Sequence, residues 1–337
     1  MSMNLATKYR PQTLDEVCGQ ENIVKILRQQ LKVNTIKNSY LFCGSSGCGK
    51  TSLARILARE INRGVGSPIE FDAASNSSVE DVRKIIDASN SKSITGEYKI
   101  YIIDEAHSLS SQAWQAFLKT LEEPSIKTIF IFCTTEVQKV PTTILNRVQR
   151  FDLTRISQSL IIERLKFVCN KESFTYEDEA LAYIAKLSKG RMRDAITYLE
   201  KVASFNSFIS LENSVQYLNA LDYQIMFKLT NAIIDRKESE ALSYIQSLDM
   251  NGKDLKVFIN EYTSFIVDVN KFIILRDFNN IDVPKICESD LMYLIKLEEA
   301  SKFYLSVLNE LVKLKEQIRY ETDVKLNLEI MVLFLCK

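Results

Sequence analysis

The stretch Tyr40-Leu41-Phe42-Cys43-Gly44-Ser45-Ser46-Gly47-Cys48-Gly49-Lys50-Thr51 decides the fold. Its first four residues form a compact apolar run typical of a buried strand, and a helical pattern follows it. The residues between them fit G-x-x-x-x-G-K-[ST] without a gap. Glycines in such a loop let backbone N–H groups turn toward phosphate oxygens, helped by the N-terminus of the next helix. The sequence therefore predicts a phosphate-binding loop, or P-loop, between a strand and a helix.

The P-loop indicates that this region holds ATP and Mg²⁺. Lys50 is expected to neutralise the β- and γ-phosphates, and Thr51 is expected to ligate the metal ion. The residues predicted to contact the nucleotide here are Gly44, Ser45, Ser46, Gly47, Cys48, Gly49, Lys50, Thr51 and Ser52.

Two adjacent carboxylates end a second apolar run, Ile100-Tyr101-Ile102-Ile103. Alone, such a pair indicates a helix cap. In a chain with a P-loop, the first acid holds the metal's water shell and the second polarises an attacking water. We therefore expect Asp104 to bind Mg²⁺ and Glu105 to act as the general base. His107, just beyond them, is interpreted as a structural or surface residue.

Three further residues are candidates for contacts with the transferring phosphoryl group. Thr135 closes the next apolar run and could orient the attacking water through its hydroxyl. Arg147 and Arg193 could stabilise negative charge in the transition state. The spacing leaves open that the threonine merely ends a strand and that either arginine forms a surface salt bridge.

Strand and helix patterns alternate in the first half, which predicts an α/β domain with a parallel sheet. Four compact apolar runs predict strands buried on both faces, and Gln149–Leu153 predicts a fifth short strand. The four runs are Tyr40–Cys43, Ile69–Phe71, Ile100–Ile103 and Ile129–Cys133; helices are expected at Ile23–Leu31, Ser52–Asn62, Val79–Ala88 and Gln112–Leu121.

The second half reads as nearly continuous helix. Three short helices are expected at about 157–170, 177–188 and 191–204, and long helices follow from about Ser210. The expected domains are a P-loop domain at 1–155, a small helical lid domain at 156–207 and an all-helical domain at 208–337.

Charge and cysteine content limit the possible classes of protein. The 43 basic and 43 acidic residues cancel, but the chain carries +5 up to residue 208 and −5 after it. Any nucleic-acid surface is therefore expected in the first two-thirds. Seven cysteines without a C-x-x-C pair, with one histidine, indicate free thiols and no zinc. The chain shows no signal-peptide core or membrane-length apolar run, so a soluble cytoplasmic protein without membrane contact is expected.

Several longer segments resemble the DNA polymerase III gamma/tau clamp-loader subunits. The opening box Lys8–Gln20 is similar to theirs, as are Phe71–Ser75 with Val79–Arg83, and Gly190–Ala195. The most specific match is Asp104-Glu105-Ala106-His107-Ser108-Leu109-Ser110 with Leu118–Pro124, continued by Thr134–Arg147. The resemblance is dense over residues 5–205 and loose beyond.

The resemblance implies an AAA+ ATPase in a homo- or hetero-pentamer that opens a sliding clamp and places it on primer-template DNA. By position, Thr135 matches the family's sensor 1 and Arg193 its sensor 2, which reaches the nucleotide of its own subunit. Arg147 matches the arginine that enters the neighbouring subunit's ATP site. The opening box would line the adenine pocket with Tyr9, Arg10 and Val17, and the region from 208 would form the collar that packs subunits together.

Three departures from the family pattern point to a compact, divergent loader, for which phage origin is one hypothesis. Residues 60–68 bridge the place of a cysteine-rich zinc module without any cysteine. The family's Ser-Arg-Cys triplet is Asn146-Arg147-Val148 here. We also expect the chain to end after the collar, without the tau extension.

Clamp loaders follow the DNA backbone, so the resemblance implies phosphate contacts at helix N-termini. The candidates are Ser77, Ser78, Arg83, Lys84, Ser110 and Ser111, and the alternative is an ordinary capped surface helix. The Ser89–Tyr98 loop, with Ile94 at its centre, resembles the region that faces the clamp. Two other functions stay open: a non-catalytic stator or scaffold subunit, and another AAA+ DNA motor of the branch-migration type.

Overall fold

The structure, a computed structural model, describes residues 4–76, 78–89, 96–123, 127–218, 220–281, 283, 287–295, 300–319 and 323–337. The chain divides into two compact units, Met1–Phe208 (unit 1) and Ile209–Lys337 (unit 2). Unit 1 carries a net charge of +5 and unit 2 a net charge of −5. The two charge surpluses therefore belong to separately folded units.

Unit 1 is built on a five-stranded sheet in the order β2-β3-β4-β1-β5, with every neighbouring pair parallel. The strands are β1 (Ser39–Cys43), β2 (Ile69–Asp72), β3 (Lys99–Asp104), β4 (Thr128–Thr134) and β5 (Gln149–Asp152). Cys43 lies opposite Thr134, and Asp72 lies opposite Asp104. The carboxyl ends of the strands therefore meet along one edge of the sheet, where ligands bind in open α/β folds.

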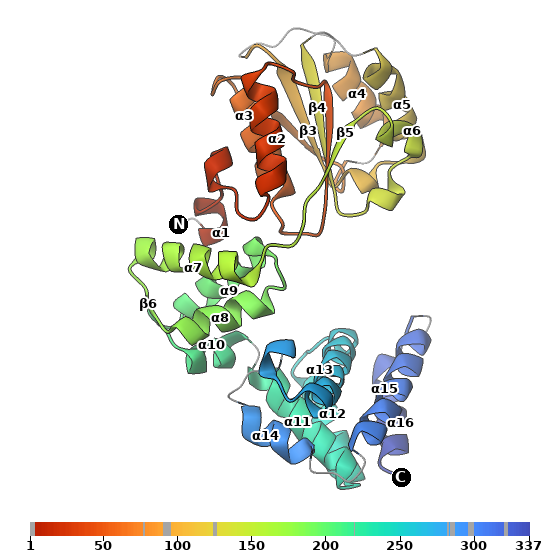
Figure 1. Ribbon diagram of the computed structural model, residues 1–337. Coiled ribbons are helices and arrows are strands. Elements are labelled where there is room, and N and C mark those ends of the chain that lie inside the picture. Colours follow the sequence, from red (N-terminus) through yellow and green to blue (C-terminus); the bar gives the residue numbers. More distant parts are fainter. Residues whose placement is uncertain are drawn as a thin grey trace. The chain divides into compact units, whose positions relative to one another are not determined.

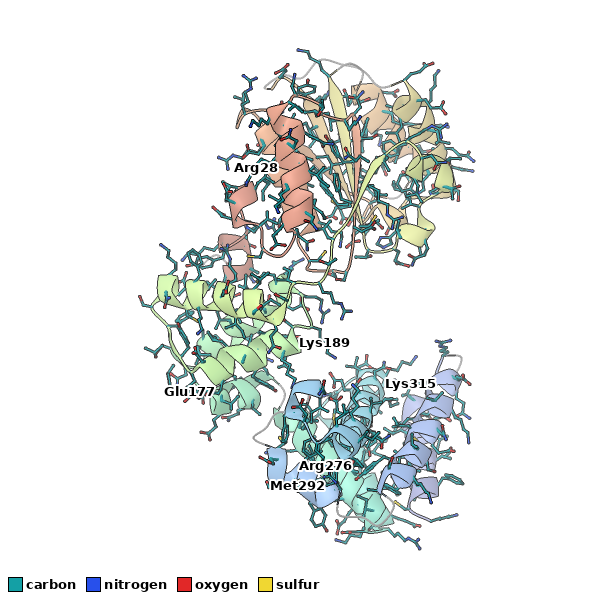
Figure 2. The ribbon with its side chains drawn as sticks, viewed as in Figure 1. Arg28, Glu177, Lys189, Arg276, Met292 and Lys315 are labelled. Atoms are coloured by element: carbon teal, nitrogen blue, oxygen red, sulfur yellow. The ribbon has the colours of Figure 1, made fainter. Side chains whose placement is uncertain are left out.

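Helices cover both faces of this sheet (Figure 1). On one face, α2 (Glu21–Lys32) and α3 (Lys50–Ile61) form an apolar core with the strands; on the other, α4 (Val79–Ser89) and α5 (Ser111–Glu122) do so. Arg28 projects outward from α2 (Figure 2) and pairs with Asp15. The side chains of β1 and β4 are buried along their whole length, as their unbroken apolar runs predict.

The prediction that all four apolar runs are buried on both faces is wrong for β2. Its side chains are mostly exposed, and Ile69 keeps 44% of its surface accessible. The reason is its place at the edge of the five-stranded sheet, where it pairs with β3 on one side only. A short apolar run does not distinguish an edge strand from a central one.

The rest of unit 1 contains the three helices expected after residue 156: α7 (Gln158–Glu172), α8 (Asp178–Leu187) and α9 (Met192–Ala203). Ser157 accepts a hydrogen bond from the N–H of Leu160 and so caps α7. The shorter elements of this unit are α1 (Leu5–Lys8), η1 (Leu14–Glu16), η2 (Ala106–Ser108), η3 (Val137–Lys139), α6 (Thr142–Leu145) and β6 (Thr175–Tyr176).

Unit 2 is helical, as its three- and four-residue apolar spacing predicts. Short strand β7 (Phe208–Ile209) precedes α10 (Leu211–Leu218), and the helices that follow enclose one apolar core. They are α11 (Ala220–Ile234), α12 (Glu238–Met250), α13 (Leu255–Leu275), η4 (Phe278–Asn280), α14 (Glu288–Leu294), α15 (Ala300–Gln317) and α16 (Val324–Leu335). In the described segments of the chain, none of the helices has the length and apolar character needed to cross a bilayer.

Candidate nucleotide-binding site

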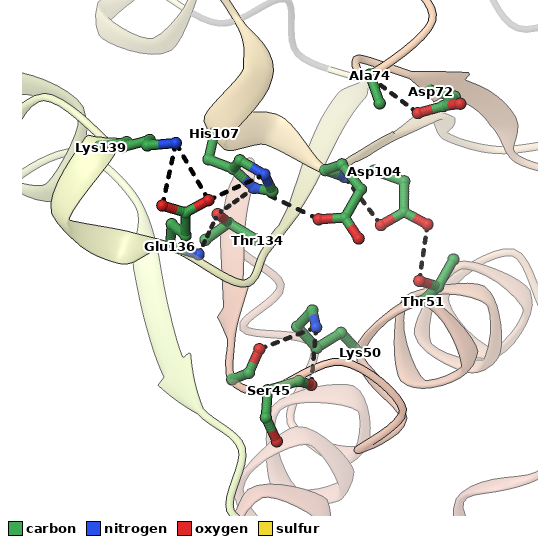
Figure 3. A network of polar contacts seen from close by, with 12 residues as sticks. Ser45, Lys50, Thr51, Asp72, Ala74, Asp104, His107, Thr134, Glu136 and Lys139 are labelled. Carbon is green, nitrogen blue, oxygen red and sulfur yellow. Dashed lines mark hydrogen bonds and ion pairs between the residues drawn. The ribbon is translucent and has the colours of Figure 1, made fainter. Parts of the chain in front are cut away.

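The P-loop connects β1 to α3, as predicted. Gly49 caps α3 with a φ of +105°, a backbone conformation that favours glycine. The loop wraps around Lys50, whose Nζ donates hydrogen bonds to the carbonyls of Gly44 (2.9 Å) and Ser45 (3.0 Å) (Figure 3). Lys50 is buried, so its ammonium is held at the centre of the loop rather than in solvent.

Two features of this loop fit a bound phosphate. The first N–H groups of α3 have no carbonyl acceptors within the helix, as at any helix start. Ser45 Oγ is buried and has no hydrogen-bond partner in the described part of the chain. Unsatisfied donors around a buried ammonium are the groups that a phosphate's oxygens would satisfy.

The acidic pair lies beside the P-loop. Thr51 Oγ1 donates a hydrogen bond of 2.8 Å to Asp104 Oδ2, and the N–H of Glu105 donates to Asp104 Oδ1 (3.0 Å). A hydroxyl and a carboxylate side by side are oxygen ligands of the kind that Mg²⁺ takes, usually with several waters retained. Thr51 and Asp104 are therefore the residues that would hold this ion.

Glu105 has an unusual backbone, with φ +45° and ψ +43°, in the left-handed region that costs energy for a residue with a side chain. Its Oε2 atom is buried and makes no hydrogen bond with any described residue, but lies 3.4 Å from Nδ1 of His107. His107 keeps 15% of its side-chain surface, which fits the structural alternative of the interpretation better than the surface one. It contacts the predicted general base.

A cavity of about 640 Å³ brings most of the predicted nucleotide residues together within unit 1. Of those predicted, Tyr9, Arg10, Val17, Ser46, Gly47, Cys48, Gly49, Lys50, Thr51, Ser52, Asp104, Glu105 and Arg193 line it. Gly44 and Ser45 contribute the carbonyls that hold Lys50. Residues from the opening box, the P-loop and α9 therefore meet around one cavity.

Cys48 contributes its backbone to this cavity rather than a reactive thiol. Its side chain is packed in the core and retains 2% of its surface. Burial raises the pKa of the thiol above its usual value. The residue therefore acts as a small apolar side chain within the loop.

Sequence reasoning missed the contribution of α7 to the cavity. Arg164 lines it and donates a hydrogen bond of 2.8 Å to the carbonyl of Tyr9. Lys8 and the Tyr9 hydroxyl both donate to Glu172, also on α7. The opening box is thus attached to the lid helices. No sequence signal separates Arg164 from an ordinary charged residue on a solvated helix face. Other lining residues not predicted are Asn4, Ala6, Thr7, Pro11, Glu16, Cys18, Ile156, Met192, Ile196 and Thr197.

Thr135 and Arg147 are not among the residues that line the cavity. Thr135 is half-buried and follows the last residue of β4. Arg147 follows α6; it donates to the carbonyl of Thr143 (2.6 Å) and pairs with Glu122. Thr135 nevertheless lies next to the start of the P-loop, because the carbonyl of its neighbour Thr134 accepts a hydrogen bond from the N–H of Gly44 (3.2 Å).

Two of the candidate phosphate contacts at the starts of α4 and α5 cap their helices. Ser78 Oγ accepts from the N–H of Asp81 (3.2 Å), and Ser110 Oγ accepts from the N–H of Ala113 (3.2 Å). Lys84 pairs with Asp81 at 3.2 Å. Arg83 and Ser111 are exposed. Ser77 and Ile94 lie outside the described residues.

Two family models match parts of unit 1. A model described as "DNA polymerase III, delta subunit" matches residues 68–157, and one described as "RCF1/5-like, AAA+ ATPase lid domain" matches residues 163–204. The DNA polymerase III subunit gamma of Buchnera aphidicola subsp. Baizongia pistaciae is 32% identical over 98% of this chain and 95% of its own length. The subunit gamma/tau of Mycoplasma genitalium is 32% identical over 91% of this chain and 57% of its own length.

Part of the chain is also similar in fold to the structure described as "Thermotoga maritima RuvB Holliday junction branch migration motor". That structure is 23% identical, with a TM-score of 0.54 over 67% of this chain and 79% of its own. The P-loop, the acidic pair and the helical lid therefore define an AAA+ ATPase. More particularly, the chain belongs to the DNA polymerase III gamma/tau family. It spans about half the length of several curated relatives and nearly all of the Buchnera gamma subunit.

Proposed function

We propose that this chain is the ATPase subunit of a DNA sliding-clamp loader, which uses ATP binding and hydrolysis to open the clamp and place it on primer-template DNA. The observation that carries the proposal is the cavity of unit 1, where the P-loop, Asp104, Glu105 and Arg193 meet. Membership in the gamma/tau family supports the assignment to a loader rather than to another AAA+ machine.

In the proposed reaction, the buried Lys50 ammonium leaves its carbonyl partners to bind phosphate oxygens. Bound Mg²⁺ would neutralise charge on the β- and γ-phosphates. Glu105 would accept a proton from the attacking water, and Arg193 would stabilise charge on the γ-phosphoryl group. Thr135 is proposed to orient the attacking water through its hydroxyl, and Arg147 is proposed to enter the ATP site of a neighbouring subunit.

Unit 2 is proposed as the collar that holds subunits together. On α16, Leu326, Ile330 and Phe334 stand four residues apart and are 51%, 56% and 62% exposed. One exposed apolar side chain is ordinary, but three on one helix face support an interface with another subunit.

DNA is proposed to contact unit 1, which carries the positive charge surplus. The starts of α4 and α5, with Ser77, Ser78, Arg83, Lys84, Ser110 and Ser111, are the proposed phosphate contacts. Because one chain has a surplus of only +5, binding should depend on several subunits together.

A reconstituted assembly with its sliding clamp and primed DNA tests the proposal. We expect ATP hydrolysis stimulated by clamp and DNA, and loss of both hydrolysis and nucleotide binding in Lys50→Ala. The control is Lys25→Ala, an exposed lysine on α2. A wild-type chain that binds no ATP would contradict the catalytic role and favour a scaffold subunit. A hexamer in native mass spectrometry, instead of a pentamer, would favour a motor of the branch-migration type.

A further inference from the structure

His107 has no part in the proposed reaction, yet its ring lies against the proposed general base. Nδ1 of His107 is 3.4 Å from Oε2 of Glu105 and 3.2 Å from Oγ1 of Thr134. The ring belongs to η2, directly after β3, whereas Thr134 ends β4. The imidazole thus bridges the ends of two neighbouring strands beside the cavity (Figure 3).

Glu105 needs a hydrogen-bond donor at Oε2. That atom is buried and makes no hydrogen bond with any residue that the structure describes. A buried carboxylate oxygen without a donor is costly, because it has lost its water without a replacement. The Nδ1–H of His107 is within reach of this oxygen: it also contacts Oγ1 of Thr134 at 3.2 Å, and a small rotation of either side chain lets the two oxygens share the hydrogen.

Glu136 lies on the far side of the ring, and Thr134 lies beside it. Nε2 lies 3.5 Å from Oε1 of Glu136, which also pairs with Lys139 at 3.0 Å. Thr134 is fully buried and its Oγ1 accepts the N–H of Glu136 (3.1 Å). The contact with Thr134 and the burial of the ring restrict its rotation, as is required of a group that orients another.

The backbone of Glu105 gives a second reason to expect a holding contact. A non-glycine residue with φ +45° persists where the surroundings hold it, and such strain is common at catalytic sites. Glu105 lines the cavity while Oε2 faces the ring, so its second oxygen remains available to a water in the cavity.

We propose that His107 is a positioning residue for ATP hydrolysis: its Nδ1–H holds one oxygen of Glu105 and so directs the other toward the attacking water. This inference rests on the proposed function. It follows the general logic in which a base is oriented by a third group. Burial and the contact of Nδ1 with Oγ1 of Thr134 keep the imidazole in place.

Three substitutions of His107 distinguish the contributions of its two ring nitrogens to turnover. An asparagine amide can stand near the position of Nδ1, a glutamine amide can stand near Nε2, and alanine removes both. In the reconstituted assembly we expect kcat to fall about 10- to 100-fold in His107→Ala and His107→Gln. This loss is a part of the rate enhancement that a general base contributes. His107→Asn should retain most of the turnover. The affinity of the isolated chain for ATP should not change in any of the three.

The matched control is Gln138→Ala, an exposed residue of η3 in the same region. Full turnover in His107→Ala, or equal losses in the asparagine and glutamine variants, would overturn the positioning role. A loss of ATP affinity that parallels the loss of turnover would also overturn it, because it would indicate a general structural role. Absence of turnover in the unaltered chain would contradict the proposed function itself. A failure of the positioning role alone leaves the turnover of the unaltered chain intact, so the two failures are distinguishable.

Discussion

Thr51 Oγ1 donates a 2.8 Å hydrogen bond to Asp104 Oδ2, across 53 positions of sequence. The contact joins the first turn of α3 to the last residue of β3. It forms because β1 and β3 lie in one parallel sheet, whose carboxyl ends share an edge. The two oxygens are therefore already together where the proposed Mg²⁺ would bind.

Replacing Thr51 should weaken binding of the Mg²⁺-nucleotide complex. Thr51→Val keeps the shape but loses the hydroxyl, and we expect ATP affinity at saturating Mg²⁺ to fall about tenfold, the loss of one bond to a charged group. Thr51→Ser keeps the hydroxyl and should bind nearly as well. Calorimetric titration with ATP, with and without Mg²⁺, checks this. Equal affinities in the valine and serine variants would exclude a metal-ligand role.

The two arginines should differ in the subunit on which they act. Arg193 lines the cavity of its own chain, so Arg193→Ala should weaken ATP binding by the isolated chain about tenfold. Arg147 does not line it, so Arg147→Ala should leave that affinity unchanged and suppress hydrolysis in the assembly. Fluorescent-nucleotide binding and ATPase assays separate the effects. Weaker binding by isolated Arg147→Ala would contradict action in a neighbouring subunit.

Gly190 should be intolerant of a side chain because of its neighbours. Gly190 and Gly64 share a left-handed backbone, with φ +82° and +80°. A Cβ at Gly190 would stand 2.7 Å from Cβ of Arg155, whereas one at Gly64 meets nothing within 4 Å. We expect Gly64→Ala to cost about 1 kcal/mol and Gly190→Ala about 1–3 kcal/mol more. Urea unfolding measures both, and equal costs would show that backbone conformation alone matters.

Attachment of α1 to the lid should weaken in acid. Hydrogen bonds from Lys8 and then Tyr9 lower the pKa of the Glu172 carboxyl below its usual value of 4.5. Because this pKa is lower in the folded chain, the contact contributes its full stabilisation to the packing of α1 above pH 4.5. This stabilisation is lost as the pH falls from 4.5 through the lower pKa of the folded state. Amide exchange of residues 5–9, corrected for intrinsic rates, should therefore accelerate below pH 4.5.

Glu172→Gln should show faster exchange of α1 at neutral pH as well, because the neutral amide cannot pair with the Lys8 ammonium. The matched control is Glu179→Gln, an exposed residue of α8. Unchanged exchange in Glu172→Gln would mean that other contacts hold α1, such as the hydrogen bond from the N–H of Leu5 to Glu200 (3.2 Å).

Most of the secondary structure and part of the site could be predicted from local patterns. The P-loop needs glycines and a lysine within eight consecutive residues, so its geometry is encoded where it forms. Asp104 and Glu105 could be placed at the end of a strand because the apolar run before them predicts a buried strand, which two charged residues end. The exposure of β2 could not, because it depends on the order of strands in the sheet.

The sequence by itself determined the loop that would hold phosphate, the alternation of strands and helices, and the family. These are properties of residues close together along the chain. Tertiary structure alone decided that the ring of His107 lies against Glu105, and that Arg164 of α7 joins the opening box at the cavity. Such contacts form only when helices and strands that are distant in sequence pack together. A charged or aromatic side chain on a helix looks the same in sequence whether it faces water or another side chain.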